Sequence, residues 1–113
     1  MKQLASADLG ELIRLLRHFG ARPGLYIGKV DVQNARCFLG GVGICLHVLA
    51  GPSTFGEYNA AAASRGWQIM PEGFEPQMRQ RGMSAAEMIA EFAEIEVAVL
   101  ERRTNQSASG SPL

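Results

Sequence analysis

Apolar residues recur every three or four positions along several stretches of the chain, which is the spacing of one face of an α-helix. Three of these stretches begin with a Ser, Thr or Asp that is followed three residues later by Glu, a pairing typical of helix starts. The pairs are Asp8 with Glu11, Thr54 with Glu57, and Ser84 with Glu87. We therefore predict helices over 8–19 and 54–63, and a last helix that begins at 84 and runs for about five turns. Gly20 and Gly66 supply left-handed stops to the first two.

A further helix is predicted from Asp31, which can cap its start, to the Gly51-Pro52 dipeptide, which ends it. This stretch is apolar on most sides, so we expect it to be the central helix of the fold. Its interior contains three glycines, Gly40, Gly41 and Gly43. Each costs a helix about 0.8 to 1 kcal/mol relative to alanine, and we expect close contact with a neighbouring helix to offset that cost.

Between the third and last of these helices the chain is interrupted by prolines and glycines. Trp67 and Ile69 alternate with Gln68 and Met70, a pattern typical of a short extended connector whose indole docks on the core. Phe74 and Met78 have the spacing of one face of a helix of one or two turns.

These elements predict an all-α fold, a compact bundle of four to five helices with a short extended connector. We assign residues 1–103 to a single helical domain and the polar residues 104–113 to a flexible C-terminal tail. Of the 113 residues 47% are hydrophobic and 19% are charged, proportions that suit one globular core. Basic and acidic residues both number 11, so no strong net field draws the chain to nucleic acid or to an anionic membrane, and we expect neither as a partner.

The two cysteines, Cys37 and Cys45, lie eight positions apart within one predicted helix. An axial separation of about 12 Å is too long for a disulfide, so we predict free thiols that fill the core as small residues. Free thiols and an N-terminus without an apolar signal segment both favour the cytoplasm.

No catalytic centre is predicted. A nucleophile needs an adjacent base, but His47 follows Cys45 by two positions, which separates the side chains by about 200° around a helix. We therefore expect His47 to be a core or groove residue. A structural zinc needs four converging ligands, and no Cys-x-x-Cys or His-x-x-x-His spacing occurs. We predict no metal, no cofactor and no enzymatic activity.

The candidate partner-binding site is an acidic ridge of the last predicted helix, formed by Glu87, Glu91 and Glu94. Such a ridge suits a basic partner, since complementary charge speeds encounter, although the solvated face of an amphipathic helix has the same pattern. A candidate ligand pocket would gather Tyr26, His47 and Trp67 from different elements.

The most distinctive segment is residues 22–28, which read Arg22-Pro23-Gly24-Leu25-Tyr26-Ile27-Gly28. Pro and Gly in sequence suit the centre of a type II turn, so we predict a buried connector. The heptad resembles one in the ATPase domain of gyrase B and its relatives. The acidic residue on the following helix and the Asp-x-Gly-x-Gly loop of those enzymes are missing here, so we infer no nucleotide site.

The same loop, followed by Phe38-Leu39-Gly40-Gly41 and then by Gly66-Trp67, resembles small bacterial helical proteins of immunity-like or uncharacterised type. The resemblance implies a protein that neutralises a partner toxin by binding it.

The sequence therefore predicts a non-catalytic protein-binding protein whose partner is another protein. One alternative is a structural or regulatory homo-oligomer, in which the glycine-bearing helix or the long last helix packs against its copy. A second is a small ligand-binding protein or enzyme with a pocket near Tyr26 and His47.

Overall fold

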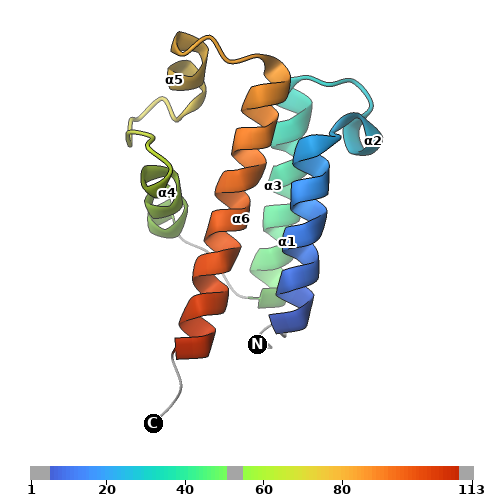
Figure 1. Cartoon of the computed structure of the whole chain (residues 1–113), viewed down its shortest axis with the longest axis vertical. Helices are drawn as coiled ribbons and strands as arrows, with labels where there is room; N and C mark the ends of the chain where they lie inside the picture. The colour runs from blue at the N-terminus through green and yellow to red at the C-terminus, as the bar shows by residue number, and fades with distance from the viewer. Residues whose placement is uncertain (1–5, 51–54, 110–113) are drawn as a thin grey trace.

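The computed structural model describes residues 6–50 and 55–109, and over these residues it contains helices and no strand (Figure 1). The helices are α1 (Ser6–Ala21), α2 (Gly24–Ile27), α3 (Val32–Ala50), α4 (Phe55–Ser64), α5 (Glu75–Gln80) and α6 (Ala85–Ser109). They form a compact globule with a radius of gyration of 14.4 Å. The predicted all-α fold is confirmed, and four of these helices have ten residues or more.

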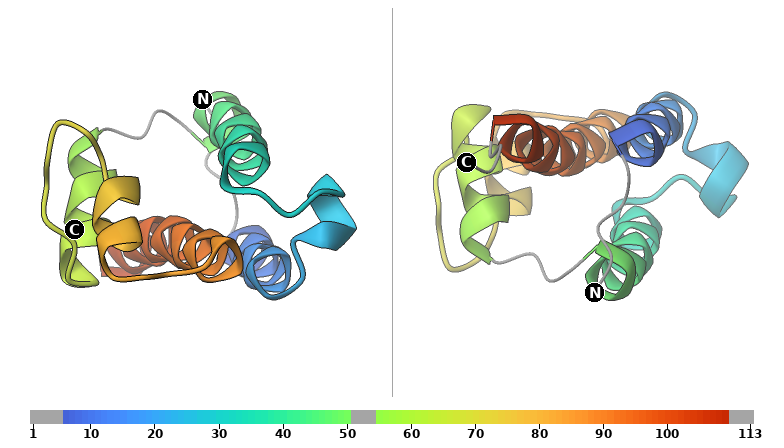
Figure 2. Two further views of the ribbon diagram at one scale, coloured as in Figure 1. Left: turned by 90° about the horizontal axis from the view of Figure 1, so that it is seen from above. Right: turned by 90° about the horizontal axis from the view of Figure 1, so that it is seen from below.

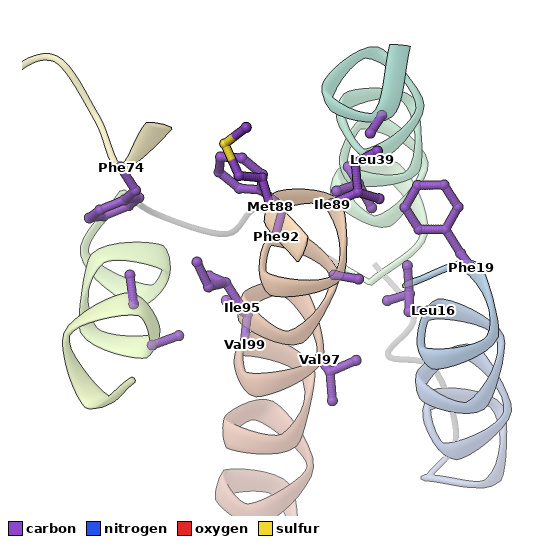
Figure 3. Packing of buried hydrophobic residues seen from close by; sticks show 14 of the residues in the cluster. Leu16, Phe19, Leu39, Phe74, Met88, Ile89, Phe92, Ile95, Val97 and Val99 are labelled. Atoms are coloured by element: carbon purple, nitrogen blue, oxygen red, sulfur yellow. The ribbon is translucent and has the colours of Figure 1, made fainter. Parts of the chain in front are cut away.

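The central helix is α6. Seen along its axis, α6 lies between α1 on one side and α4 on the other, while α3 packs on a third side at a distance from α4 (Figure 2). Figure 3 shows side chains of the neighbouring helices converging on α6. Its buried residues are Met88, Ile89, Phe92, Ala93, Ile95, Val97, Val99 and Leu100. The apolar residues whose helical spacing predicted this helix thus form its buried face.

The prediction that α3 is the central helix is wrong. Its buried side chains are confined to Val32, Ala35 and Leu39, all in the first half of the helix. In the second half Ile44 is 69% exposed and Val48 is 63% exposed. An apolar sequence shows that a helix can be covered, but it does not show that the same chain covers it.

The glycines of α3 also differ from expectation. A Cβ added at any of Gly40, Gly41 and Gly43 would meet nothing within 4 Å, so no other helix that the structure describes approaches them closely. By length and composition alone, Val32–Leu49 would suffice to cross a membrane, a test that the core helices of soluble proteins also pass.

The close helix contact lies elsewhere, between α1 and α6. A Cβ added at Gly20 would lie 3.0 Å from the Cβ of Ala93 and 3.6 Å from the backbone of Ala90. Gly20 does not have a positive φ, and α1 continues through Ala21, so its predicted role as a left-handed stop is wrong. Its missing side chain instead lets the two helices approach closely.

Two of the four predicted helix starts are confirmed, at Asp31 and Ser84, whereas Asp8 lies inside α1 and its predicted capping role is wrong. Ser84 and Glu87 form the reciprocal capping box, with N···O distances of 2.7 and 3.1 Å. The carboxylate of Asp31 accepts a hydrogen bond from the backbone N–H of Asn34 at 2.7 Å. The first helix begins at Ser6, two residues before the expected start. Thr54 and the Gly51-Pro52 stop lie outside the described residues.

The segment 22–28 is not a type II turn. Pro23 has φ −62° and ψ −30°, which are helical values, so the chain enters the single turn of α2 directly. Gly28, with φ 72°, ends that turn. Leu25 is 70% exposed, so the predicted buried connector is wrong, although Pro23 itself is buried.

The connector and the end of the chain complete the fold. Trp67 is buried as predicted, Phe74 and Met78 are buried as well, and Gly66 with φ 93° closes α4. The last helix extends to Ser109, past the predicted boundary at 103. Adding residues to an existing helix is easier than starting one, so polar residues can prolong it.

Glycine substitutions distinguish the close contact from the open one. We expect Gly20→Val to lower the free energy of unfolding by about 1 to 3 kcal/mol, because the branched side chain would force α1 away from Ala93. The matched variant Gly41→Ala should raise it by up to about 1 kcal/mol, since this helical position is open to solvent. Urea unfolding followed by circular dichroism measures both, and a stable Gly20→Val protein would contradict the packing described.

Candidate functional site

A groove is lined by residues of α3, α4 and α6. Figure 2 shows α3 and α4 on different sides of α6. The groove contains a pocket of about 300 Å³. The pocket is lined by Arg36, Leu39, Gly40 and Gly43 of α3, by Tyr58 of α4, and by Phe92, Glu96 and Val99 of α6. This lining is apolar apart from one guanidinium, one phenol and one carboxyl group.

Helix geometry explains how these residues come together. Phe92, Glu96 and Val99 are four and three positions apart, so they share one face of α6. On the opposite wall Gly40 and Gly43 present no side chain, and a Cβ at either would meet nothing within 4 Å. The two glycines therefore widen the groove instead of serving as contact points for another helix.

Glu96 is the chemically distinctive residue of the groove. Its side chain is mostly buried, and it forms no hydrogen bond or ion pair with any residue that the structure describes. Burial disfavours the charged form of a carboxyl group and raises the pKa of Glu96 from 4.5 to about 7. Near neutral pH the Glu96 carboxyl group is therefore present in two forms, a protonated acid that can donate a hydrogen bond and a carboxylate without a described partner.

Tyr58 faces Glu96 from α4. Burial raises the pKa of its phenol above the ordinary value of 10.0, and the nearby Glu96 carboxylate adds to that effect. The hydroxyl therefore stays protonated and can donate or accept a hydrogen bond in the groove.

Arg36 lies at the end of the groove near α5, where it is held away from Glu96. Its Nη1 is 3.2 Å from a carboxylate oxygen of Glu75, and its guanidinium lies 5.8 Å from the ring centre of Phe92. The pKa of Glu75 is lowered, first by a hydrogen bond from Arg79 and further by Arg36. A second hollow of about 260 Å³ continues the groove here and is lined by Gln33, Arg36, Cys37 and Glu75.

The acidic ridge is engaged within the molecule. Glu87 caps α6, and Glu94 lies 3.7 Å from Arg17 of α1. Glu91 accepts hydrogen bonds from Nε and Nη2 of Arg65, at 2.7 and 2.8 Å, and from Nε1 of Trp67, at 2.8 Å. Burial acts to raise the pKa of Glu91, but these hydrogen bonds outweigh it and lower the pKa. The three carboxylates thus have three separate intramolecular roles.

The structure does not bring Tyr26, His47 and Trp67 together. The hydroxyl of Tyr26 lies 2.7 Å from Nδ1 of His18, in an aromatic cluster with Phe19 and Phe38. Trp67 packs under Arg81, whose guanidinium is 4.1 Å from the ring centre. His47 is exposed near the end of α3, so its predicted core or groove position is wrong.

The cysteines are free but are not core residues. Both Cys37 and Cys45 are exposed on α3, because the helix does not occupy the centre of the fold as predicted. No group of three or more potential metal ligands occurs among residues 6–50 and 55–109. Comparison of the chain with protein-family profiles, with curated proteins and with solved structures found no match.

The sequence contained a signal for Glu96 that its residue type obscured. Glu96 lies in an acidic stretch of the chain, where a glutamate is usually solvated. Its spacing from Phe92 and Val99, however, places it on an apolar face.

The unpaired carboxyl should make stability fall as the pH rises. The folded pKa of Glu96, about 7, exceeds the unfolded value of 4.5, so the unfolded state loses its proton first and unfolding is favoured between these values. We expect the free energy of unfolding of Glu96→Gln, measured relative to the unmodified protein, to increase by about 3 kcal/mol from pH 4.5 to pH 8. Urea unfolding across this range measures the difference. The exposed Glu72→Gln serves as control, and a pH-independent difference for Glu96→Gln would show that the carboxyl is not desolvated.

Proposed function

We propose that the chain is a non-catalytic protein-binding protein whose partner covers the outward face of α3 and the groove beside it. One observation carries the proposal: Ile44 and Val48, one turn apart on α3, are 69% and 63% exposed, and the adjacent Leu49 is 56% exposed. Contiguous exposed apolar side chains on a small protein are typical of an interaction surface. The partner-binding surface proposed from the structure therefore differs from the acidic ridge, whose carboxylates have intramolecular partners.

The groove contains no activated nucleophile among the described residues. Burial works against ionisation of both Tyr58 and Glu96, so neither is activated as a nucleophile. Cys45 does not line the groove, and neither cysteine forms a hydrogen bond or ion pair with a described residue.

The packing of α3 also favours a protein partner over a bilayer. The first half of the helix buries Val32, Ala35 and Leu39 in the core, and Arg36 pairs with Glu75 of α5. Insertion of Val32–Leu49 across a membrane would break these contacts and place the charged Arg36 within the span, which is unfavourable. A partner protein can cover the exposed second half of α3 and leave the first half packed in the core. The resemblance to immunity-like proteins suggests that this partner is a toxin.

Site-specific photo-crosslinking tests the proposal. We expect the full chain carrying p-benzoylphenylalanine at position 44 or 48, in the cell of origin, to give one discrete adduct heavier than twice the chain mass of 12.2 kDa. The same group at Arg14, on the outward face of α1, serves as control. Ile44→Asp should reduce the adduct from position 48 by about tenfold, as expected when an apolar contact is replaced by a buried charge. Equal adducts from Arg14 would refute the assignment of the surface.

A second candidate function is a homo-oligomer that pairs α3 with its copy. Cys37, Gly41 and Cys45 form a stripe of small residues on the exposed face, and small residues let two helices approach closely. In an antiparallel pair centred on Gly41, Cys37 of one copy faces Cys45 of the other, because each lies four positions from the centre.

Cysteine oxidation tests this alternative. If copies pair in this way, mild oxidation should link two chains through Cys37 and Cys45, and either Cys37→Ser or Cys45→Ser should abolish the linked dimer. Two Cys45 residues would lie about 12 Å apart along the axis, beyond disulfide reach. Light scattering that shows a monomer at millimolar concentration, together with no linked dimer, would leave only the heterologous partner.

A further inference from the structure

We propose that the partner inserts an arginine side chain into the groove, where its guanidinium pairs with the carboxylate of Glu96. The inference rests on the proposed protein-binding function and specifies the chemistry of the partner. It starts from the geometry of the groove, in which one carboxyl group stands on an otherwise apolar floor between Phe92 and Val99.

Charge complementarity determines the class of occupant. Glu96 has no hydrogen-bond or ion-pair partner among residues 6–50 and 55–109, and a buried carboxylate without a partner is unfavourable. A cation that enters the groove removes this cost, whereas an anion would increase it. Apolar walls exclude water and so strengthen the attraction between the two charges.

The basic residue already in the groove does not take this place. Arg36 faces Glu75 at 3.2 Å, and it accounts for no part of the pKa shift of Glu96. Glu75 holds both Arg36 and Arg79 at that end of the groove, so within the pocket lining Glu96 is the carboxyl group that has no described partner. The pocket volume of about 300 Å³ is ample for a single arginine side chain.

The aromatic lining favours guanidinium over ammonium. Phe92 and Tyr58 both line the pocket, and a planar guanidinium stacks on aromatic rings and is less strongly hydrated than an ammonium group. The hydroxyl of Tyr58 offers the guanidinium an additional acceptor beside the carboxylate. The glycine wall at Gly40 and Gly43 lets the partner backbone come close enough for the side chain to reach the floor.

The site can be tested on the full chain without the partner. n-Propylguanidinium, which reproduces the end of an arginine side chain, is titrated at pH 8 while the amide resonances of Gly40 and Gly43 are followed by NMR. We expect saturable shifts that become about tenfold weaker in affinity in Glu96→Gln and unchanged in Glu72→Gln, a factor that corresponds to about 1.4 kcal/mol. The neutral isostere n-propylurea should not bind, and n-butylammonium should bind more weakly than n-propylguanidinium.

Several results would overturn the inference. The first is that n-propylurea binds as tightly as n-propylguanidinium. The second is that n-propylguanidinium binds Glu96→Gln as tightly as the unmodified protein, and the third is that neither glycine resonance shifts. The photo-crosslinked adduct from position 48 then distinguishes a failure of the arginine contact from a failure of the protein-binding function. If Glu96→Gln reduces that adduct while Glu72→Gln does not, the cation belongs to the partner. An adduct that Glu96→Gln leaves unchanged overturns the arginine contact but not the protein-binding function, whereas no adduct in any variant overturns that function itself.

Discussion

The close approach of α1 to α6 is the constraint on which the other helices depend. Gly20 and Ala93 let the two backbones come together, so α1 packs closely along one side of α6. The rest of α6 is shared between α3 and the shorter α4, which lie too far apart to close over it (Figure 2). The groove, and the exposure of the second half of α3, follow from this arrangement, because a helix that packs by one edge leaves its remaining faces open.

Much of this arrangement could be predicted from local sequence signals, and its centre could not. The capping pair of Ser84 with Glu87 depends on residues three positions apart, so the start of α6 could be predicted correctly, whereas Asp8 of the first predicted pair lies inside α1. The choice of central helix depends on long-range packing. The apolar character of α3 suggested burial, whereas α6, with a glutamate in almost every turn, is the helix that is surrounded. The glutamates of α6 lie beside an apolar stripe, and this stripe is wide enough to contact three other helices.

The candidate site shows the same limit. The spacing of Glu87, Glu91 and Glu94 along one helix can be read correctly from the sequence. The partners of Glu94 and Glu91 come from elsewhere in the chain, Arg17 from α1 and Arg65 from the end of α4. Nothing in the local sequence indicates that these distant arginines converge on α6. Glu96 was missed for the opposite reason, since its importance comes from the absence of such a partner in the described part of the chain. Sequence spacing can place a residue on a face, but only the fold determines what faces it.

Glu91 and Glu96 are buried to different effect, and this difference bears directly on function. Both are partly buried on the same helix, yet hydrogen bonds from Arg65 and Trp67 lower the pKa of Glu91, whereas burial raises that of Glu96 to about 7. This fold can therefore supply basic partners to a buried carboxylate, and next to Glu96 it commits Arg36 to Glu75 instead. In the free protein a proton partly neutralises Glu96 near pH 7, and a cation that enters the groove must displace it. The carboxylate charge that destabilises the folded protein when it is unpaired is thus the charge that a bound cation would neutralise, and a ligand that binds only the folded state stabilises that state.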